Sequence, residues 1–152
     1  MPPEDNNSCK TSRIILGTSG FQYKDWVGSF YPDGTKTTDM LPLYADKFGA
    51  VELNFTYYGL PNAPQMERMA KATPGDFEFI VKAHKTTTHD LTLKDVAPLM
   101  EGLQPLADAE KLHGILCQFP WRFRNTADNR RHLVKLRKEF ADVPLFIEFR
   151  HN

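Results

Sequence analysis

The segment FEFIVKAH, residues 77–84, is an apolar run that becomes polar at its downstream end. Successive side chains of a β-strand point to opposite faces, so Phe77, Phe79 and Val81 share one face. The opposite face ends on Lys82 and His84. A strand with one apolar face and one face that turns polar is expected where helices cover a single side of a sheet and a polar mouth opens on the other.

Four further runs have the same character. Each is rich in Ile, Val, Leu or Phe and is bounded by Gly or Pro, which favours buried strands over helices. They are RIILGTS from Arg13, AVELNFTYY from Ala50, GILCQFP from Gly114 and PLFIEFRH from Pro144. With residues 77–84 they predict a fold of five strands.

The segments between these runs have helical spacing and recognisable ends. Their expected first residues are Asp39, Asn62, Asp95, and either Thr126 or Asp128. Gln65, three residues after Asn62, resembles the second half of a capping box. Pro105 lies inside the third helical segment and is expected to kink or break it.

Alternating strands and helices predict an α/β fold. Every connection is long enough for a right-handed crossover, so the strands should be parallel. A doubly wound sheet and part of a barrel both remain open at this level. The polar strand ends favour the barrel, because helices on both sides of a sheet would leave both of its faces apolar.

Polar and charged residues recur at the downstream ends of the predicted strands. The carboxyl ends of parallel strands are where α/β folds bind ligands. The residues expected to share this mouth are Glu52, Asn54, Lys82, Gln118, Glu148 and Arg150. Their charges must pair with one another or with a ligand, because burying an unpaired charge costs several kcal/mol. An ion-pair network with a purely structural role is the alternative.

Composition limits the function classes. The 152 residues carry 19 basic and 19 acidic side chains, so no overall field attracts nucleic acid or anionic lipid. Cys9 and Cys117 are far apart and form no CxxC pair, which suits a reducing compartment. No apolar run approaches the ~20 residues of a membrane span. We expect a cytoplasmic protein with a disordered tail at residues 1–12 and one domain at residues 13–152.

Five motifs in this order resemble the YecE-like family, also called domain of unknown function 72. They are LGTSGFQYKDWVGSFYPDG, LPLYADKFGAVELNFTYYGLP, FEFIVKAHKTTTHD, GILCQFP and FIEFRH. The resemblance runs from Ile14 to His151 and implies a TIM-barrel-like fold, for which about 250 residues is usual. It also implies a barrel truncated after the fifth parallel strand. The exposed edge of that strand would then favour self-association or a complementary barrel fragment.

The resemblance and the strand ends together name the candidate site residues. Glu52, Lys82 and Glu148 are the candidate catalytic groups, with the two carboxylates as acid and base and the lysine tuning one of them. Lys82 could also act as a Schiff-base nucleophile, or could simply neutralise Glu52. The candidate ligand-binding residues are Thr18, Ser19, Tyr23, Trp26, Asn54, Tyr57, His84, Gln118, Arg150 and His151.

No cofactor is expected from the sequence. Side chains near the strand ends that could bind a divalent metal are His84, His89, Asp90, Glu148 and His151. They lack HxH and HExxH spacing, so loop histidines facing solvent are the favoured interpretation. The turn GTSG at residues 17–20 could hold an anion through its amides, but it lacks the rest of a phosphate-binding loop.

The function expected from these residues is ligand binding at the carboxyl ends of the strands. The ligand would be small and polar or anionic: phosphorylated, sugar-like or a nucleotide. The protein would act on it as a hydrolase or an isomerase, with Arg150 clamping the anionic group. The alternative is a module that binds a ligand or partner without turnover, inactive through truncation.

Overall fold

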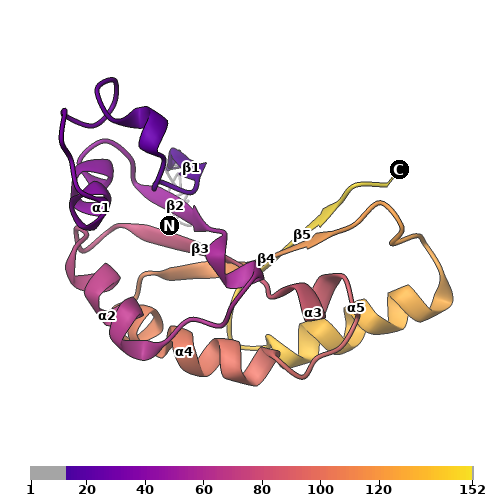
Figure 1. The fold of residues 1–152 in the computed structure, drawn as a ribbon. Helices are drawn as coiled ribbons and strands as arrows, with labels where there is room; N and C mark the ends of the chain where they lie inside the picture. The colour runs from indigo at the N-terminus through magenta and orange to yellow at the C-terminus, as the bar shows by residue number, and fades with distance from the viewer. Residues whose placement is uncertain (1–12, 152) are drawn as a thin grey trace, which may run out of the picture.

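The computed structural model describes residues 13–151, which form a curved parallel sheet with helices packed on one side (Figure 1). Its five strands lie in the order β1-β2-β3-β4-β5, and every neighbouring pair is parallel. They are β1 (Gly17–Ser19), β2 (Ala50–Leu53), β3 (Glu78–Lys82), β4 (Leu112–Phe119) and β5 (Leu145–Phe149). The predicted α/β class and the parallel pairing are confirmed.

The connections between strands carry the helices. These are α1 (Thr37–Ala45), α2 (Ala63–Lys71), α3 (Lys85–Thr88), α4 (Val96–Asp108) and α5 (Ala127–Glu139), with 3-10 turns η1 (Lys24–Trp26) and η2 (Phe55–Tyr57). Figure 1 shows α2, α4 and α5 along the same side of the sheet. The opposite face is therefore left to the strands and the loops at their ends.

Side-chain caps explain where two of these helices begin. The Asn62 side chain accepts a hydrogen bond from the amide of Gln65 at 3.0 Å, as the predicted helix start requires. Thr126 caps α5 by accepting from the Asn129 amide at 3.2 Å. The prediction for Asp39 is wrong, because α1 begins at Thr37 and Asp39 lies in its first turn. A carboxylate there still favours the helix through the macrodipole.

The predicted break at Pro105 does not occur. The helix α4 continues through Pro105 to Asp108. Proline removes the hydrogen bond to the carbonyl of Glu101, a residue that is exposed on the outer side of the helix. Leu103 and Leu106, on either side of the proline, are fully buried. Their packing outweighs the lost hydrogen bond.

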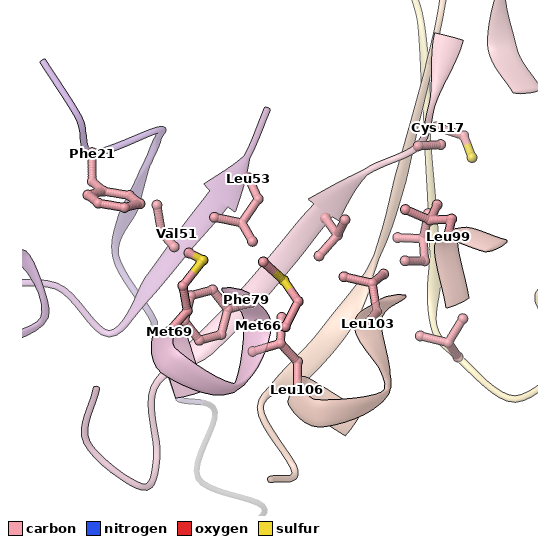
Figure 2. Close-up of a cluster of buried hydrophobic side chains, with 14 of the residues drawn as sticks. Phe21, Val51, Leu53, Met66, Met69, Phe79, Leu99, Leu103, Leu106 and Cys117 are labelled. Atoms are coloured by element: carbon pink, nitrogen blue, oxygen red, sulfur yellow. The ribbon is translucent and has the colours of Figure 1, made fainter. Parts of the chain in front are cut away.

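The core lies between the sheet and the helices. Figure 2 shows Leu53 and Phe79 of the strands gathered with Met66 of α2 and Leu103 of α4. Cys117 of β4 belongs to the same cluster, and its burial raises the pKa of its thiol to about 12. The thiol is therefore an apolar core group with little nucleophilic character.

Burial along the strands follows the alternation predicted from the sequence. In β3, Phe79 and Val81 are buried, whereas Glu78, Ile80 and Lys82 are partly exposed. The apolar residues face the helices and the polar ones face the open side, which positions the candidate site.

Within residues 13–151, no helix has both the length and the apolar character needed to cross a membrane. The predicted tail at residues 1–12, including Cys9, lies outside the described residues.

Candidate functional site

The strand register aligns polar side chains on the open face. Ser19 of β1 lies opposite Glu52 of β2, and Gln118 of β4 lies opposite Glu148 of β5. Lys82 is the last residue of β3, between these two pairs. All five therefore lie near the carboxyl ends of parallel strands and away from the helices, as the sequence predicted.

Over β3, β4 and β5 the polar side chains form one hydrogen-bonded group, which we call the cationic group: Lys82, Gln118, Glu148 and Arg150. The Lys82 ammonium donates to Gln118 Oε1 at 2.9 Å, and Arg150 Nη2 donates to the same oxygen at 3.0 Å. Gln118 Nε2 donates to Glu148 Oε1 at 2.7 Å. The carboxylate on one side and the cations on the other thus fix the orientation of the Gln118 amide.

The sharing of Gln118 Oε1 brings two cations together. Because both donors bond one oxygen, at 2.9 and 3.0 Å, Lys82 Nζ and Arg150 Nη2 are at most about 5.9 Å apart. Within residues 13–151, the one ion pair that either cation forms is the 3.9 Å contact between Arg150 Nε and Glu148 Oε1. Two like charges that converge on a neutral acceptor repel each other, and an anion placed between them would relieve that repulsion.

Over β1 and β2 lies a second polar group, formed by Ser19, Glu52 and Asn54. The Ser19 hydroxyl donates to Glu52 Oε1 at 2.9 Å and accepts from Asn54 Nδ2 at 2.7 Å. Beside them is a cavity of about 150 Å³, lined in part by Tyr23, Glu52 and Asn54. The ordered carboxylate at its wall could orient or deprotonate a bound molecule.

Glu52 and Lys82 do not neutralise each other directly. Within residues 13–151, no ion pair joins them, since Lys82 bonds Gln118 and Glu52 bonds Ser19. The alternative in which Lys82 and Glu52 neutralise each other as a direct ion pair is therefore wrong. The candidate catalytic residues Glu52, Lys82 and Glu148 share the open face, but they belong to two separate hydrogen-bonded groups.

Tyr57 and His89 border the cationic group. The Lys82 ammonium lies over the Tyr57 ring, 5.5 Å from its centroid, and the His89 ring meets Tyr57 edge-on at 5.2 Å. Burial lowers the pKa of His89 below its ordinary 6.5, and the charges of Arg122, Lys82 and Arg150 lower it further, against an opposing effect of Asp90. His89 is therefore a neutral ring beside several cations at pH 7.

His84 is held by groups from its own loop and from the start of α4. Its Nδ1 lies 2.9 Å from Thr86 Oγ1 and 3.3 Å from Asp95 Oδ2. Thr86 Oγ1 in turn donates to Asp95 Oδ2 at 2.7 Å. The Thr86 amide also donates to Nδ1, at 3.4 Å, so this nitrogen faces one donor and two oxygens, and the Asp95 carboxylate favours the tautomer with a proton on Nδ1.

The Asp95 side chain thus contacts His84 and Thr86, in the segment after β3, rather than capping the helix α4 that it precedes. It is the N-cap residue of α4, yet its side chain makes no capping hydrogen bond. We expect Asp95→Asn to reduce the fraction of His84 that carries its proton on Nδ1, because the variant removes the carboxylate and its amide can offer an N–H to a nitrogen that already accepts from the Thr86 amide. Long-range ¹H–¹⁵N correlation spectra of the ring nitrogens would measure this. An unchanged tautomer in Asp95→Asn would show that Asp95 does not orient His84.

The candidate residues of the first loop mainly hold that loop in place. Thr18 donates to the Gly20 carbonyl at 2.6 Å and also bonds the Tyr44 hydroxyl, on the helix side of the sheet. The Tyr23 hydroxyl donates to the Ser19 carbonyl, and Trp26 packs against Tyr23 with ring centroids 4.8 Å apart. Only Tyr23 of these three lines the cavity beside Glu52.

Two residues that sequence reasoning missed lie in the loop after β4. Arg122 Nη2 donates to the His89 carbonyl at 2.6 Å. The Trp121 ring contacts His151, with centroids 4.7 Å apart. His151 itself also bonds Arg124 at 2.7 Å. The sequence does place these residues, in PWRF, directly after a predicted strand. They lie in the loop beyond the strand, however, where the alternating pattern no longer indicates which way a side chain points.

The described part of the chain contains no cluster of three or more His, Cys, Asp or Glu side chains suited to a metal ion. His84, His89 and His151 are each engaged by different neighbours: Asp95, Tyr57 and Trp121, respectively. The possibility of a shared histidine metal site therefore receives no support from their placement.

Comparison with known proteins finds relatives that match most of the chain. A family model described as "Protein of unknown function DUF72" matches residues 15–152. The chain is 30% identical over 146 residues to UPF0759 protein YunF of Bacillus subtilis, covering 91% of this chain and 51% of that protein.

Two solved structures are similar to the chain. A DUF72 family protein of Thermotoga maritima has a TM-score of 0.79 and 37% identity, covering 90% of this chain and 55% of that one. A DUF72 family protein of Enterococcus faecalis has a TM-score of 0.70 and 28% identity, covering 90% and 51% respectively. The chain spans about half the length of these relatives. Its sequence and fold place it in the DUF72 family, the same family as the YecE-like proteins that its motifs resemble.

Proposed function

We propose that this protein binds a small anionic ligand at the carboxyl ends of β3, β4 and β5. The observation that carries the proposal is the convergence of Lys82 and Arg150 on one neutral oxygen, Gln118 Oε1. A phosphate or carboxylate oxygen beside that point would accept charge-assisted hydrogen bonds from both side chains. Gln118, anchored by Glu148, would hold the two cations in place before the ligand arrives.

The proposal includes a barrel-like setting for the site. The sheet curves with its helices on one side, and its relatives are about twice as long. Ile147 and Phe149 point to the helix side of β5 but remain 38% and 50% exposed. Further strands and helices, from the same or another chain, would cover them and close the mouth around the ligand. We propose a cytoplasmic location for this activity, with no cofactor bound.

Catalysis is the second part of the proposal. Glu52 and Glu148 come from different strands and stand on either side of Lys82, so they could act as acid and base on a bound ligand. Hydrolysis or isomerisation of a small anionic compound can use such a pair as general acid and general base. Asn54 and Gln118 would orient its polar atoms.

Titration with inorganic phosphate tests the binding site. We expect ¹H–¹⁵N spectra of the protein to show saturable shifts of Gln118 and its neighbours. Lys82→Met and Arg150→Met should each weaken the affinity by about 10- to 100-fold, since a hydrogen bond to a charged group contributes ~1.5–3 kcal/mol. Arg131→Met is the matched control, because Arg131 pairs with Asp128 on α5. Equal phosphate affinity in all these variants would refute the proposed site.

A further inference from the structure

Beyond the cationic group, side chains at the ends of four strands form a continuous border, which we call the aromatic-basic rim. It consists of Tyr57, Tyr58, His89, Trp121, Arg122 and His151. Tyr57 contacts Tyr58 at 4.9 Å and His89 at 5.2 Å between ring centroids. Arg122 bonds the His89 carbonyl, and the adjacent Trp121 contacts His151. These contacts link the loops that follow β2, β3, β4 and β5.

The rings of the rim are available to a ligand. Tyr58 is 77% exposed and Trp121 is 61% exposed. Other aromatic rings near the strand ends behave differently: Phe30 and Tyr31 pack against each other at 4.8 Å, and Tyr31 is buried. Packing thus accounts for Tyr31 and covers more of Phe30, which is 37% exposed, than of Tyr58 or Trp121. Large aromatic surface exposed beside polar groups is typical of interaction sites.

Positive charge accompanies these rings. Lys82 lies over Tyr57, and Arg122 reaches the loop that carries His89. Arg122 and Lys82 bond a carbonyl and an amide oxygen, and neither forms an ion pair within residues 13–151. The pKa of His89 is lowered by burial and by the charges of Arg122, Lys82 and Arg150, so all three cations lie near this one ring. Cations that bond neutral oxygens rather than carboxylates, next to exposed rings, match the chemistry of phosphates joined to flat ring systems.

We propose that the ligand is a nucleoside monophosphate, whose phosphate is bound by Lys82 and Arg150 and whose base stacks on Trp121. This inference rests on the anion site proposed above, which binds only the phosphate, and adds a binding surface for the base. Arg122, next to Trp121 in the chain, supplies a third positive charge near the phosphate. The small number of rings and their position around one mouth suit a single nucleotide. Binding of a single-stranded oligonucleotide is the competing outcome of the test.

The test uses the two tryptophans of the chain, Trp26 and Trp121. In a Trp26→Phe variant, the fluorescence of Trp121 alone reports on its surroundings. We expect adenosine monophosphate to quench it and to bind at least tenfold more tightly than inorganic phosphate. Trp121→Leu should abolish this gain and leave the affinity for phosphate, measured by NMR, unchanged. Tyr58→Leu is the companion variant, with a smaller expected effect.

The outcomes separate this inference from the anion site. Phosphate binding with no gain for adenosine monophosphate would overturn the nucleotide and leave the anion site standing. Absence of binding by both would overturn both proposals. Loss of phosphate affinity in Trp121→Leu would assign Trp121 to support of the loop and overturn stacking. A single-stranded oligonucleotide that binds far more tightly than the monophosphate would also overturn the single-nucleotide assignment.

Discussion

Replacing Phe79 by alanine is expected to destabilise the protein by about 3–5 kcal/mol. Phe79 is fully buried in β3, and its ring meets Phe77 edge-on at 5.1 Å. Figure 2 shows it facing the helices, close to Met66 and Leu106. Such a loss is a large part of the ~5–15 kcal/mol that stabilises a typical domain. It matters for function because β3 carries Lys82 at its end.

Urea denaturation of the full chain would measure this change through the midpoint of unfolding. Phe55→Ala is the matched control, since it removes the same ring from a side chain that is 37% exposed. It should cost less than half as much. Equal losses in the two variants would contradict the burial pattern on which the two faces of the sheet depend.

Replacing Lys111 by methionine should cost about 3 kcal/mol, since it takes the donor from three partly buried acceptors and a buried acceptor without a donor costs ~1–3 kcal/mol. Lys111 is only 6% exposed. Its ammonium donates to the carbonyl of Ala70 at 2.5 Å, to the carbonyl of Thr73 at 2.8 Å and to the Thr73 hydroxyl at 3.0 Å. It thereby ties the end of α2 to the start of β4. Burial lowers the pKa of Lys111, a cost that these acceptors offset.

Lys71→Met provides the control for this second prediction. Lys71 lies on α2 itself, and its exposed ammonium pairs with Glu67 at 2.6 Å. Exposed pairs of this kind contribute less than about 1 kcal/mol. Thermal unfolding followed by circular dichroism should separate the two variants clearly. If Lys111→Met and Lys71→Met had the same midpoint temperature of unfolding, the buried ammonium would not link α2 to β4.

Alternation along the strands could be predicted because it follows from backbone geometry alone. Phe79 and Val81 face the helices and Lys82 faces the open side, in the order that the sequence indicates. The start of α2 was also readable, since Asn62 caps it through a local contact. Both features depend on residues close in sequence.

The pairing of polar groups could not be predicted in the same way. Which neighbour Lys82 chooses depends on the register between strands, and it bonds Gln118 rather than Glu52. Asp95 looked like a helix cap, but contact with Thr86 and His84 redirects its carboxylate. These contacts join side chains from different elements, and a pattern within one segment does not indicate which side chains of other segments lie nearby.

The continuation of α4 through Pro105 has a similar cause. Local propensity predicted a break, but tertiary packing of Leu103 and Leu106 overrides it. The rim was missed for another reason: Trp121 and Arg122 follow β4 in a loop, where no periodic pattern shows which side chains lie together. Two contacts, of Arg122 with the His89 carbonyl and of Trp121 with His151, show that these residues border the site.

Crystals of the protein soaked in selenate, a tetrahedral dianion, would test the anion site most directly. Anomalous scattering locates the selenium without reference to any assumed ligand pose. The account predicts a selenate whose oxygens lie within hydrogen-bonding distance, about 2.7–3.2 Å, of Lys82 Nζ and Arg150 Nη2. Selenate bound at other surface positions, with none between Lys82 and Arg150, would contradict it.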